Sequence, residues 1–596
     1  MAERTISAAL RQGQQTDWKV ECSCMEKIQT IYYRGFIKSC NYRCSYCAFA
    51  KGSGNREEMR REEDGLRWFY EQIRRQAEAV QIFFLPYGEG MIYPMYQAIL
   101  ADLSALPQVR AVGIQTNLSW EPESFLRLLR QRGDAGKIRL WATYHPEMTS
   151  RAGFLDRIKQ LADEVEIAAG MVATLENEDE IRALRAELPP PIYLWLNAMD
   201  RRKAAFSREI IERLQAIDPM FGYEFARYRQ EASGGAGFCR CLAAENQYLD
   251  RGMVRPGCFF QKSEKRKNQL CHNHRLCDCY LGYSNFAGNP LARFFGANRA
   301  FRIPQKRQWQ AIFLDFDGVL TENGRLLAGL PELLAALSAG CRLYLATARS
   351  VSSVRRVLGR AYRFFSGGVF FDGACVIDRE TGLEMTWPIA PAEKEQILRF
   401  LTEKEQVKKM PVGAKQGLEE VEISQEADTE VWADKQFIDD LIENNLTTEE
   451  KRIVSRTEQM PMLEENWLSM AGRIKPQFLK GELLRLQIPT TLAGQLGQTP
   501  LRRREYGSRT YFQAVSASKG GGIDRIMKRS GWSKEDVLIM TDNPQDKELL
   551  QSFPYTAVPL HQPKLASQAY YALNAGQLPL VAGGDLTKMR EKISRN

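Results

Sequence analysis

Six apolar runs, each followed by charged amphipathic sequence, restrict the fold of this chain most strongly. The runs predict strands, and the segments between them, such as Arg56–Ala79, Glu121–Arg132 and Asn177–Glu187, predict helices. Strand–helix–strand units form parallel sheets, because the helix returns the chain to the edge where the strand began. We therefore expect an α/β fold, with a sheet that is open or closed into a partial (β/α)6 TIM-like barrel. The predicted strands are Thr30–Ile37, Gln81–Pro86, Ala111–Thr116, Ile138–Tyr144, Val165–Val172 and Ile192–Asn197.

A second α/β pattern starts at Ala311, where the run AIFLDFDG predicts a buried strand. Further strands are predicted at Cys341–Thr347 and Val537–Thr541, as in a Rossmann-like domain. The polar, irregular sequence at about 372–507 predicts an inserted cap. At 596 residues the chain is too long for one core. The predicted parts are an N-terminal extension (1–29), a barrel domain (30–235), a cysteine-rich module (236–301), a linker (302–310) and a Rossmann-like domain (311–596) that carries the cap.

Charge and hydropathy restrict the partners and the compartment. The formal net charge is +9, but the basic residues are spread along the chain, so the charge alone does not indicate a nucleic-acid partner. We interpret clusters such as Arg502, Arg503 and Arg504 as solvated loops. The first residues lack the apolar core of a secretory signal, and no run of about 18 apolar residues predicts a membrane helix. We therefore expect a cytoplasmic protein with no membrane partner.

The thirteen cysteines need another explanation than disulfides, because the cytoplasm keeps thiols reduced. Eleven of them lie before residue 280, and Cys40, Cys44 and Cys47 directly follow the predicted strand TIYYRGFI. Three thiolates in one loop can bind three irons of a [4Fe–4S] cluster and leave the fourth iron open. Structural zinc is the alternative, although it usually takes four ligands.

This loop resembles the CxxxCxΦC motif of the radical S-adenosylmethionine (SAM) superfamily. The resemblance implies a [4Fe–4S] cluster on the three cysteines, SAM as a second cofactor and an electron donor such as flavodoxin or ferredoxin. It also implies that Tyr46 packs on the adenine of SAM. His145 ends the fourth strand, where it could bind substrate, transfer a proton or be a structural imidazole.

Residues at the ends of the second and third strands are candidates for binding SAM. The sequence Pro-Tyr-Gly-Glu after the second strand resembles the superfamily's Gly-Gly-Glu motif, with Tyr87 in place of one glycine. The resemblance implies that Gly88 and Glu89 contact the SAM amino group. Thr116 and Asn117 end the third strand and are expected to touch SAM.

Six more cysteines follow between residues 239 and 279. A short hairpin that turns at Arg251 and Gly252 lies among them. Cysteines around a hairpin resemble the auxiliary-cluster extensions (SPASM or twitch type) of radical SAM enzymes, which implies an auxiliary iron–sulfur cluster. Zinc is the rival, because His272 or His274 could join a zinc site. The expected ligands are Cys241, Cys258, Cys277 and Cys279, with Cys239 and Cys271 as competitors.

Asp315 and Asp317 end the apolar strand that opens the second domain. Paired carboxylates at the mouth of a sheet suit phosphoryl transfer, because Asp315 can attack phosphorus while Asp317 shuttles the proton of the leaving oxygen. Thr347, after the next strand, can hydrogen-bond phosphoryl oxygens, and Lys519 can neutralise the aspartate and the phosphate. Mg²⁺ is the expected cofactor, and the carboxylates predicted to hold it are Asp315, Asp317, Asp542 and Asp546.

These parts resemble, in their order, the haloacid-dehalogenase (HAD) superfamily. The long insertion between Thr347 and Lys519 is similar to that of the sugar-phosphatase (Cof-type) branch. The sequence from Asp372 to Ala374 resembles that branch's Asn-Gly-Ala entry into the cap, with Asp in place of Asn. The resemblance implies a phosphohydrolase that acts on phosphorylated small molecules.

Both halves together predict a bifunctional enzyme. One half is a radical SAM enzyme that generates a 5′-deoxyadenosyl radical to modify an unidentified substrate, and the other is a Mg²⁺-dependent phosphohydrolase. Two alternatives stay open. The radical half could modify a nucleic acid or a peptide, although no recognisable RNA-binding module supports the nucleic acid. The cysteine-rich half could instead be a zinc-stabilised scaffold or regulatory binding module for the phosphatase.

Overall fold

The computed structural model describes residues 28–47, 54–199, 205–223, 225, 246–255, 291–322, 324–349, 351–393, 396, 485–489, 499–506 and 509–583. All expected ligands of the cysteine-rich module, from Cys239 to Cys279, lie outside these residues, as do His272 and His274. The chain divides into two compact units. The first segment of unit 1 ends at Arg307, within the segment expected to be a linker, and unit 2 runs from Gln308 to Tyr570.

The described residues after Tyr570 correct the predicted extent of the second domain. We expected that domain to continue to residue 596, but residues 571–583 belong to unit 1. Gln577 Nε2 donates to Ala216 O at 3.0 Å, and Arg307 forms a parallel bridge with Ala582. These contacts hold the segment on the first unit.

Unit 1 is built on a sheet of eight strands in the order β6-β5-β4-β3-β2-β1-β7-β8. The first six strands are parallel and follow one another in the sheet as in the chain. The predicted parallel α/β architecture is thus confirmed, whereas closure into a partial barrel stays a prediction, because β6 and β8 are edges among the described strands. The strands are β1 (Gln29–Arg34), β2 (Val80–Phe84), β3 (Val109–Thr116), β4 (Ile138–Tyr144), β5 (Glu166–Ala173), β6 (Leu194–Ala198), β7 (Gln247–Asp250) and β8 (Met253–Arg255).

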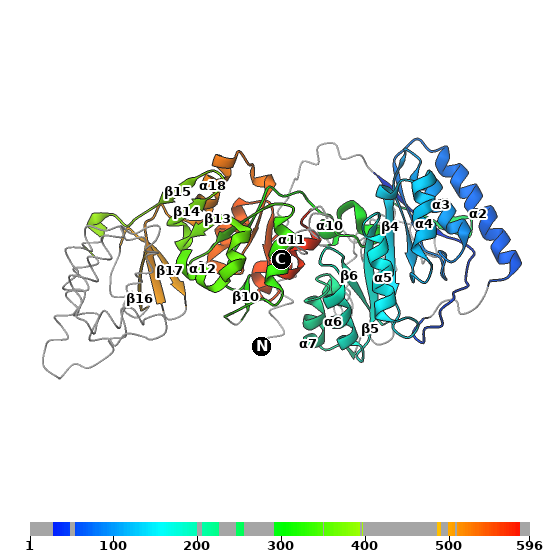
Figure 1. The fold of residues 1–596 in the computed structure, drawn as a ribbon, viewed down its shortest axis with the longest axis horizontal. Helices are drawn as coiled ribbons and strands as arrows, with labels where there is room; N and C mark the ends of the chain where they lie inside the picture. The colour runs from blue at the N-terminus through cyan, green and yellow to red at the C-terminus, as the bar shows by residue number, and fades with distance from the viewer. Residues whose placement is uncertain are drawn as a thin grey trace, which may run out of the picture. The chain divides into compact units, whose positions relative to one another are not determined.

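The helices α2 to α7 of unit 1 lie in the chain between successive strands, and α2 to α5 pack in a row beside the sheet (Figure 1). Right-handed crossovers between neighbouring parallel strands bring such helices to one face. The apolar stripe of α2 illustrates the packing, since Phe69 lies against Tyr33 and Phe84. The helices are α2 (Arg56–Arg74), α3 (Pro94–Ser104), α4 (Pro122–Arg132), α5 (Arg151–Leu161), α6 (Glu178–Glu187), α7 (Arg208–Gln215) and α10 (Leu291–Phe295).

Aromatic side chains and one arginine fill the middle of the other face of this sheet. Trp141 stacks on Phe83, and Phe301 packs edge-on against Phe83. Arg302 Cζ lies 4.4 Å from the ring centroid of Trp141 and 4.0 Å from that of Trp195. Cation–π contacts of a buried guanidinium stabilise such packing. A functional site on this face would therefore lie at the strand ends.

The strands of unit 2 form a sheet in the order β15-β14-β13-β12-β9-β19-β20. The neighbours from β13 to β20 are parallel, which confirms a mixed α/β domain. The strands are β9 (Ala311–Leu314), β12 (Arg342–Ala346), β13 (Phe365–Phe370), β14 (Cys375–Asp378), β15 (Leu383–Thr386), β19 (Val537–Met540) and β20 (Thr556–Val558), with a separate pair β10 (Thr321–Glu322) and β11 (Arg325–Leu326). The helices are α11 (Leu330–Ser338), α12 (Val351–Leu358), α18 (Lys519–Ser530), α19 (Lys547–Ser552) and α20 (Pro563–Ala566).

The antiparallel strands β14 and β15 correct the start of the predicted cap. We expected the cap from about residue 372, but Val376 of β14 pairs with Val369 of β13 and both are fully buried. The apolar sequence of β14 therefore belongs to the core sheet. Two strands of the expected cap, β16 (Arg485–Pro489) and β17 (Arg502–Tyr506), form a separate antiparallel sheet with β18 (Arg509–Gln513) in the middle, so this sheet extends past the expected end of the cap at about residue 507.

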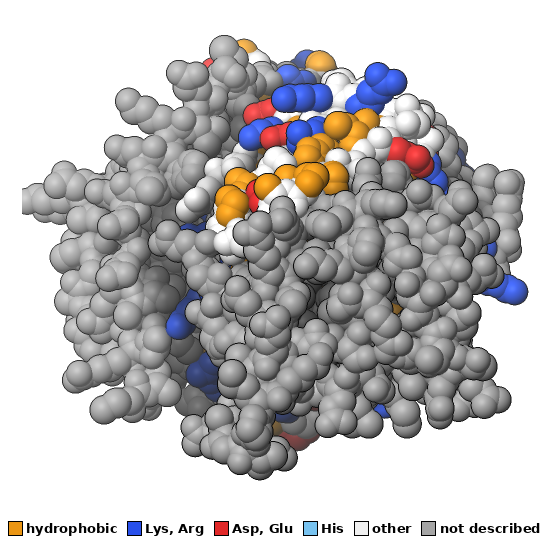
Figure 2. All heavy atoms as spheres, turned by 90° about the vertical axis from the view of Figure 1, so that its left-hand side faces the viewer, with side chains coloured by type: hydrophobic (Ala, Val, Ile, Leu, Met, Phe, Trp, Pro, Cys, Tyr) orange, Lys and Arg blue, Asp and Glu red, His pale blue; other side chains and the backbone are white. Residues whose placement is uncertain are grey.

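No described helix is long and apolar enough to cross a bilayer. Figure 2 shows one face of the molecule, where hydrophobic side chains of the described residues lie beside Lys, Arg, Asp and Glu side chains. Apolar atoms contribute much of any folded protein's surface, so this mixture needs no partner to explain it.

Candidate functional site

The carboxyl ends of three strands of unit 2 bring together the residues predicted for phosphoryl transfer. β9 lies between β12 and β19, and in open α/β sheets a crevice forms at such a switch point. Asp315 follows β9, Thr347 follows β12, and Asp542 and Asp546 follow β19. Lys519 is the first residue of α18. Parallel register thus gathers residues that are distant in the chain.

Lys519 connects two of the buried carboxylates. Its Nζ donates to Asp315 Oδ2 at 2.6 Å and to Asp546 Oδ2 at 2.7 Å. Thr541 Oγ1 lies within 3.3 Å and 3.1 Å of the same two oxygens. Burial raises the pKa of Asp315 to about 7, against the effect of the Lys519 ammonium. Burial also acts to raise the pKa of Asp546, but Lys519 and Arg504 outweigh it and hold that pKa below its ordinary value.

Asp317, the predicted proton donor and acceptor, forms a forked ion pair with Arg349. The Nε and Nη2 atoms of Arg349 each lie 2.8 Å from an oxygen of Asp317. The backbone N–H of Arg349 also donates to Oγ1 of the buried Thr347 at 3.1 Å. Because both oxygens of Asp317 face Arg349, this geometry does not support the predicted role of Asp317 as a metal ligand.

Asp315 and Asp542 are the carboxylates that fit a magnesium ion. A Cβ at Gly318, where φ is +70°, would overlap Asp542 Oδ2, so Asp542 directly touches the loop after Asp315. The Asp542 charge also helps to raise the pKa of Asp315, and a cation between the two would relieve that repulsion. Mg²⁺ is often held by one or two carboxylates plus waters and substrate phosphates. In the described part of the chain, no three His, Cys, Asp or Glu side chains are arranged to hold a metal, and Asp546 faces Lys519 instead.

Two arginines at this edge were missed by the sequence analysis. Arg349 lies two residues after Thr347, and that proximity was its only signal. We expected Arg502 to Arg504 to be a solvated loop, but these residues form β17, and Arg504 is buried with Nη1 2.9 Å from Asp546 Oδ1. Adjacent residues of a strand face opposite sides of its sheet. A predicted strand at these residues would therefore have placed Arg504 on the other face from Arg503.

The predicted cysteine loop of unit 1 also lies at the carboxyl edge of a parallel sheet. A Cβ at Gly88, after β2, would overlap the backbone oxygen of Ser39, and the N–H of Glu89 donates to that oxygen at 3.1 Å. The buried Glu89 carboxylate accepts from Thr116 Oγ1 at 2.8 Å and from the N–H of Asn117 at 2.5 Å. Burial raises the pKa of Glu89 to about 7. The predicted SAM-binding residues therefore meet in one network against the loop.

Side chains of the cysteine loop contact the ends of β3 and β4. Asn117 Nδ2 lies 3.8 Å from Cys40 Sγ. His145 Nδ1 lies 3.4 Å from Cys44 Sγ and 2.8 Å from Tyr46 OH. The Tyr46 ring, which we expected to pack on adenine, stacks on the His145 ring. Burial lowers the pKa of His145 to about 4, so the imidazole is neutral at neutral pH.

The chemistry of the donor set in this loop fits a thiophilic metal or cluster. Burial raises the pKa of Cys44 to about 11 and that of Cys40 above its ordinary value, so a metal would have to displace the thiol protons. Thr143 Oγ1, near the end of β4, is buried and has no hydrogen-bond partner among the described residues. The described Cys, His, Asp and Glu side chains nevertheless include no preformed group of three for a metal. The described residues around the cysteine loop are therefore packed against it, but they do not form a complete set of metal ligands.

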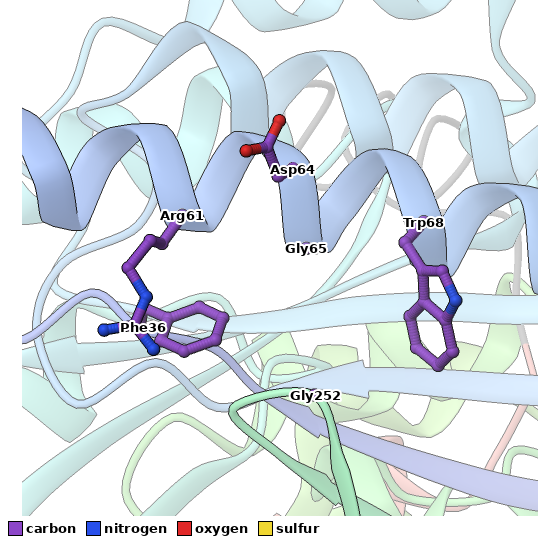
Figure 3. Close-up of a pocket in the computed structure, with 6 residues that line it drawn as sticks. All are labelled: Phe36, Arg61, Asp64, Gly65, Trp68 and Gly252. Atoms are coloured by element: carbon purple, nitrogen blue, oxygen red, sulfur yellow. The ribbon is translucent and has the colours of Figure 1, made fainter.

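A separate hollow of about 250 Å³ lies between α2 and the β7–β8 turn (Figure 3). None of the predicted site residues lines it. Arg61 Cζ lies 4.4 Å from the ring centroid of Phe36 at its wall. The lining residues are Phe36, Arg61, Asp64, Gly65, Trp68 and Gly252.

Comparisons with known proteins find similarity in structure alone. No protein-family model matches the chain, and no curated protein matches its sequence. The HAD subclass IIB sugar phosphatase BT4131 is 17% identical over 47% of this chain and 98% of its own, with a TM-score of 0.31. A HAD/COF-like hydrolase from Plasmodium vivax is 16% identical over 51% of this chain and 99% of its own, with a TM-score of 0.32. BT1666 from Bacteroides thetaiotaomicron, a HAD-superfamily phosphatase, is 14% identical over 48% of this chain and 95% of its own, with a TM-score of 0.31.

Proposed function

We propose that unit 2 hydrolyses phosphate monoesters of small molecules through a phosphorylated Asp315. The observation that carries this proposal is the 2.6 Å contact between Lys519 Nζ and Asp315 Oδ2 at the crevice of the sheet. A buried carboxylate beside an ammonium can meet an anionic substrate that an isolated carboxylate would repel. Thr347 and Asp317, at the ends of neighbouring elements, add a hydroxyl and an acid to the same site.

The two steps of this reaction use Asp315 and Asp317 in turn. One oxygen of Asp315 attacks phosphorus, the bond from phosphorus to the ester oxygen breaks, and protonated Asp317 gives its proton to that oxygen. Asp317 then takes a proton from water, whose oxygen attacks phosphorus and releases phosphate and Asp315. Lys519 and Thr347 stabilise the charge on the phosphoryl oxygens in both steps. Mg²⁺ held by Asp315 and Asp542 would neutralise further charge on those oxygens.

Phosphate release from a panel of sugar and nucleotide monophosphates tests this function. The wild type and Asp524→Asn, a control on the α18 helix outside the charged cluster, should release phosphate with Mg²⁺ and lose activity in EDTA. Asp315→Asn keeps the shape of the side chain but removes the nucleophile, so it should be inactive. Equal turnover by Asp315→Asn would refute the role of Asp315, and no release from any compound by the wild type would refute the function.

For unit 1 we propose radical SAM chemistry, served by an electron donor such as flavodoxin or ferredoxin. This proposal is supported by the packing of Gly88 and Glu89 on the cysteine loop at the carboxyl edge of the sheet. A [4Fe–4S] cluster on Cys40, Cys44 and Cys47 would supply one electron to SAM.

The surrounding side chains hold the loop for that role. Glu89 fixes the end of β2 to the end of β3 through Thr116 and Asn117. The Asn117 amide points its N–H toward Cys40 Sγ, and such a donor favours the thiolate form that a metal requires. Cys44 and Tyr46 meet at neutral His145.

Anaerobic reconstitution with iron and sulfide, followed by an assay of 5′-deoxyadenosine from SAM and a strong reductant, tests the second function. The wild type and Cys341→Ala, a cysteine of unit 2, should form the product, whereas Cys47→Ala should not. Protein that stays free of iron, or iron-loaded protein that never cleaves SAM, would favour the scaffold. Retention on RNA at moderate salt would favour a nucleic-acid substrate.

A further inference from the structure

Five charged side chains are buried together beside the phosphoryl-transfer site. Asp315, Asp372 and Asp546 are the acids, and Lys519 and Arg504 are the bases; each side chain is at most 7% exposed. Four of the five belong to the core of unit 2, but Arg504 comes from β17, inside the segment inserted between β15 and α18. A buried charge is costly unless it is paired, so each member needs the others.

The contacts form a chain that starts at Arg504. Its Nη1 donates to Asp546 Oδ1 at 2.9 Å, and the other oxygen of Asp546 accepts from Lys519 Nζ at 2.7 Å. Lys519 Nζ in turn donates to Asp315 Oδ2 at 2.6 Å. We propose that Arg504 is a positioning residue for phosphoryl transfer: it holds Asp546 in the orientation that holds Lys519 against Asp315. This inference rests on the function proposed for unit 2.

Asp372 explains why one lysine is not enough. Its Oδ1 lies 3.9 Å from both Lys519 Nζ and Arg504 Nη1, and the side chain is fully buried. It occupies a tight turn with φ of +51°, and a Cβ at the next residue, Gly373, would overlap the backbone of Ser518. The backbone at Asp372 is therefore fixed against Ser518, with the Asp372 side chain inside the core. Without Arg504, one lysine would face three buried carboxylates.

The same strand provides a matched control. β17 pairs with β18, and Arg504 is opposite Tyr511 while its neighbour Arg503 is opposite Phe512. Arg503 is exposed and pairs with exposed Glu505, so it carries the same charge on the outer side of the same strand. From β18, Gln513 Nε2 donates to Asp372 O at 3.1 Å, which fastens this small sheet to the turn. The inserted segment thus supplies the charge of Arg504 and, through Gln513, a hydrogen bond that holds the turn at Asp372.

Four variants of the full chain test the role of Arg504 by phosphate release and by urea unfolding. Arg504→Met should lower kcat about tenfold or more, with a smaller effect on KM, because Lys519 loses its orientation in both the free and the bound enzyme. Arg504→Lys can still donate one N–H to Asp546, so its kcat should lie closer to that of the wild type than to that of Arg504→Met. Arg503→Met should stay within about twofold of the wild type.

The double variant Arg504→Met with Asp372→Asn removes one charge of each sign. Its urea midpoint should lie closer to that of the wild type than the midpoint of Arg504→Met does, since the two losses are coupled. If Arg504→Met does not fold, a folded double variant and an active Arg504→Lys support the proposal. Folded Arg504→Met with wild-type kcat, or Arg504→Lys as inactive as Arg504→Met, overturns it. A wild type without any phosphatase activity overturns the proposed function as well, whereas an active wild type with an indifferent Arg504→Met overturns only the role of Arg504.

Discussion

Lys519 Nζ lies 2.6 Å from Asp315 Oδ2, although the two residues are 204 positions apart in the chain. The pair forms because β9 lies beside β12 and β19 at the centre of a parallel sheet and α18 begins at the same edge. Both side chains are buried, so either one alone would be an uncompensated charge in the core. A buried ion pair of this kind adds little to the stability of the fold. Its position at the crevice of the sheet favours a functional role instead.

Gly318→Ala should abolish the function proposed for unit 2. The new Cβ would overlap Asp542 Oδ2 and displace the loop that carries Asp315, and a shift of about 1 Å at a reacting group costs about 100-fold in rate. Gly324→Ala is the matched control, because Gly324 also has positive φ but has open space around it. Both variants should lose about 1 kcal/mol of stability. Similar phosphatase rates for the two would contradict this account of Asp542.

Arg349→Met should affect catalysis more than folding. The ion pair between Arg349 and Asp317 is partly exposed, and pairs of that kind contribute about 0–1 kcal/mol. Loss of the forked contact leaves Asp317 free to rotate, so we expect kcat to fall about tenfold while the melting temperature changes little. Arg360→Met, at an exposed position after α12, serves as the control. A large loss of stability with unchanged kcat would assign the pair a structural role.

Glu62→Ala should destabilise unit 1 strongly. The buried Glu62 carboxylate accepts from Tyr96 of α3, and from Tyr33 and the N–H groups of Phe36 and Ile37 in the segment that leads to the cysteine loop. Its removal leaves several buried donors unsatisfied, which costs about 1–3 kcal/mol for each group.

Urea unfolding measures that loss, with Glu63→Ala as the exposed neighbour. Glu63→Ala should stay within about 0.5 kcal/mol of the wild type. If Glu62→Ala is as stable as Glu63→Ala, the hydrogen-bond network does not hold this part of the chain.

Asp218 should make the stability of unit 1 depend on pH. Burial raises its pKa from 3.8 to about 6, despite hydrogen bonds from Tyr193 and from the N–H groups of Leu196 and Met220. The folded state therefore holds the proton more tightly than the unfolded state, so this contribution is fully present below about pH 4 and is lost as the pH rises through 6. The full effect is about 3 kcal/mol.

Calorimetry between pH 4 and 7 checks this sign. Asp218→Asn should make the fall in stability with rising pH smaller, whereas Asp156→Asn, at an exposed position of α5, should leave it as large as in the wild type. If the wild type instead became more stable relative to Asp218→Asn as the pH rises from 4 to 7, the assignment of a raised pKa to Asp218 would be contradicted.

Much of the fold followed from the sequence, because apolar runs between amphipathic segments leave few alternatives to parallel strands. Ile138–Tyr144 is a strand at the predicted bounds, and the β7–β8 hairpin turns at Arg251 and Gly252 as expected. The sequence also placed Asp315 and Thr347 at one edge of the sheet, since the carboxyl ends of neighbouring parallel strands share an edge, whereas Lys519 reaches Asp315 from the start of α18.

The sequence was less informative where partners are distant in the chain. Arg504 was taken for a solvated residue because its burial depends on which side of β17 faces Asp546, which three consecutive arginines do not reveal. Asp317 and Asp546 were expected to hold a metal, but Arg349 and Lys519 occupy their oxygens. Tyr46 was expected to meet a cofactor, and its contact with His145 is a tertiary pairing without a local signal.

A covalent phosphate on Asp315 is the most direct test of the central claim. Asp317→Ala should react with p-nitrophenyl phosphate, because nitrophenolate leaves without a proton from Asp317, but should hydrolyse the intermediate slowly for want of a base. After acid quenching, peptide mass spectrometry should then find phosphate on Asp315 in Asp317→Ala and none in the double variant with Asp315→Asn. Turnover of the ester with no covalent phosphate, or with phosphate on another residue, would contradict the account.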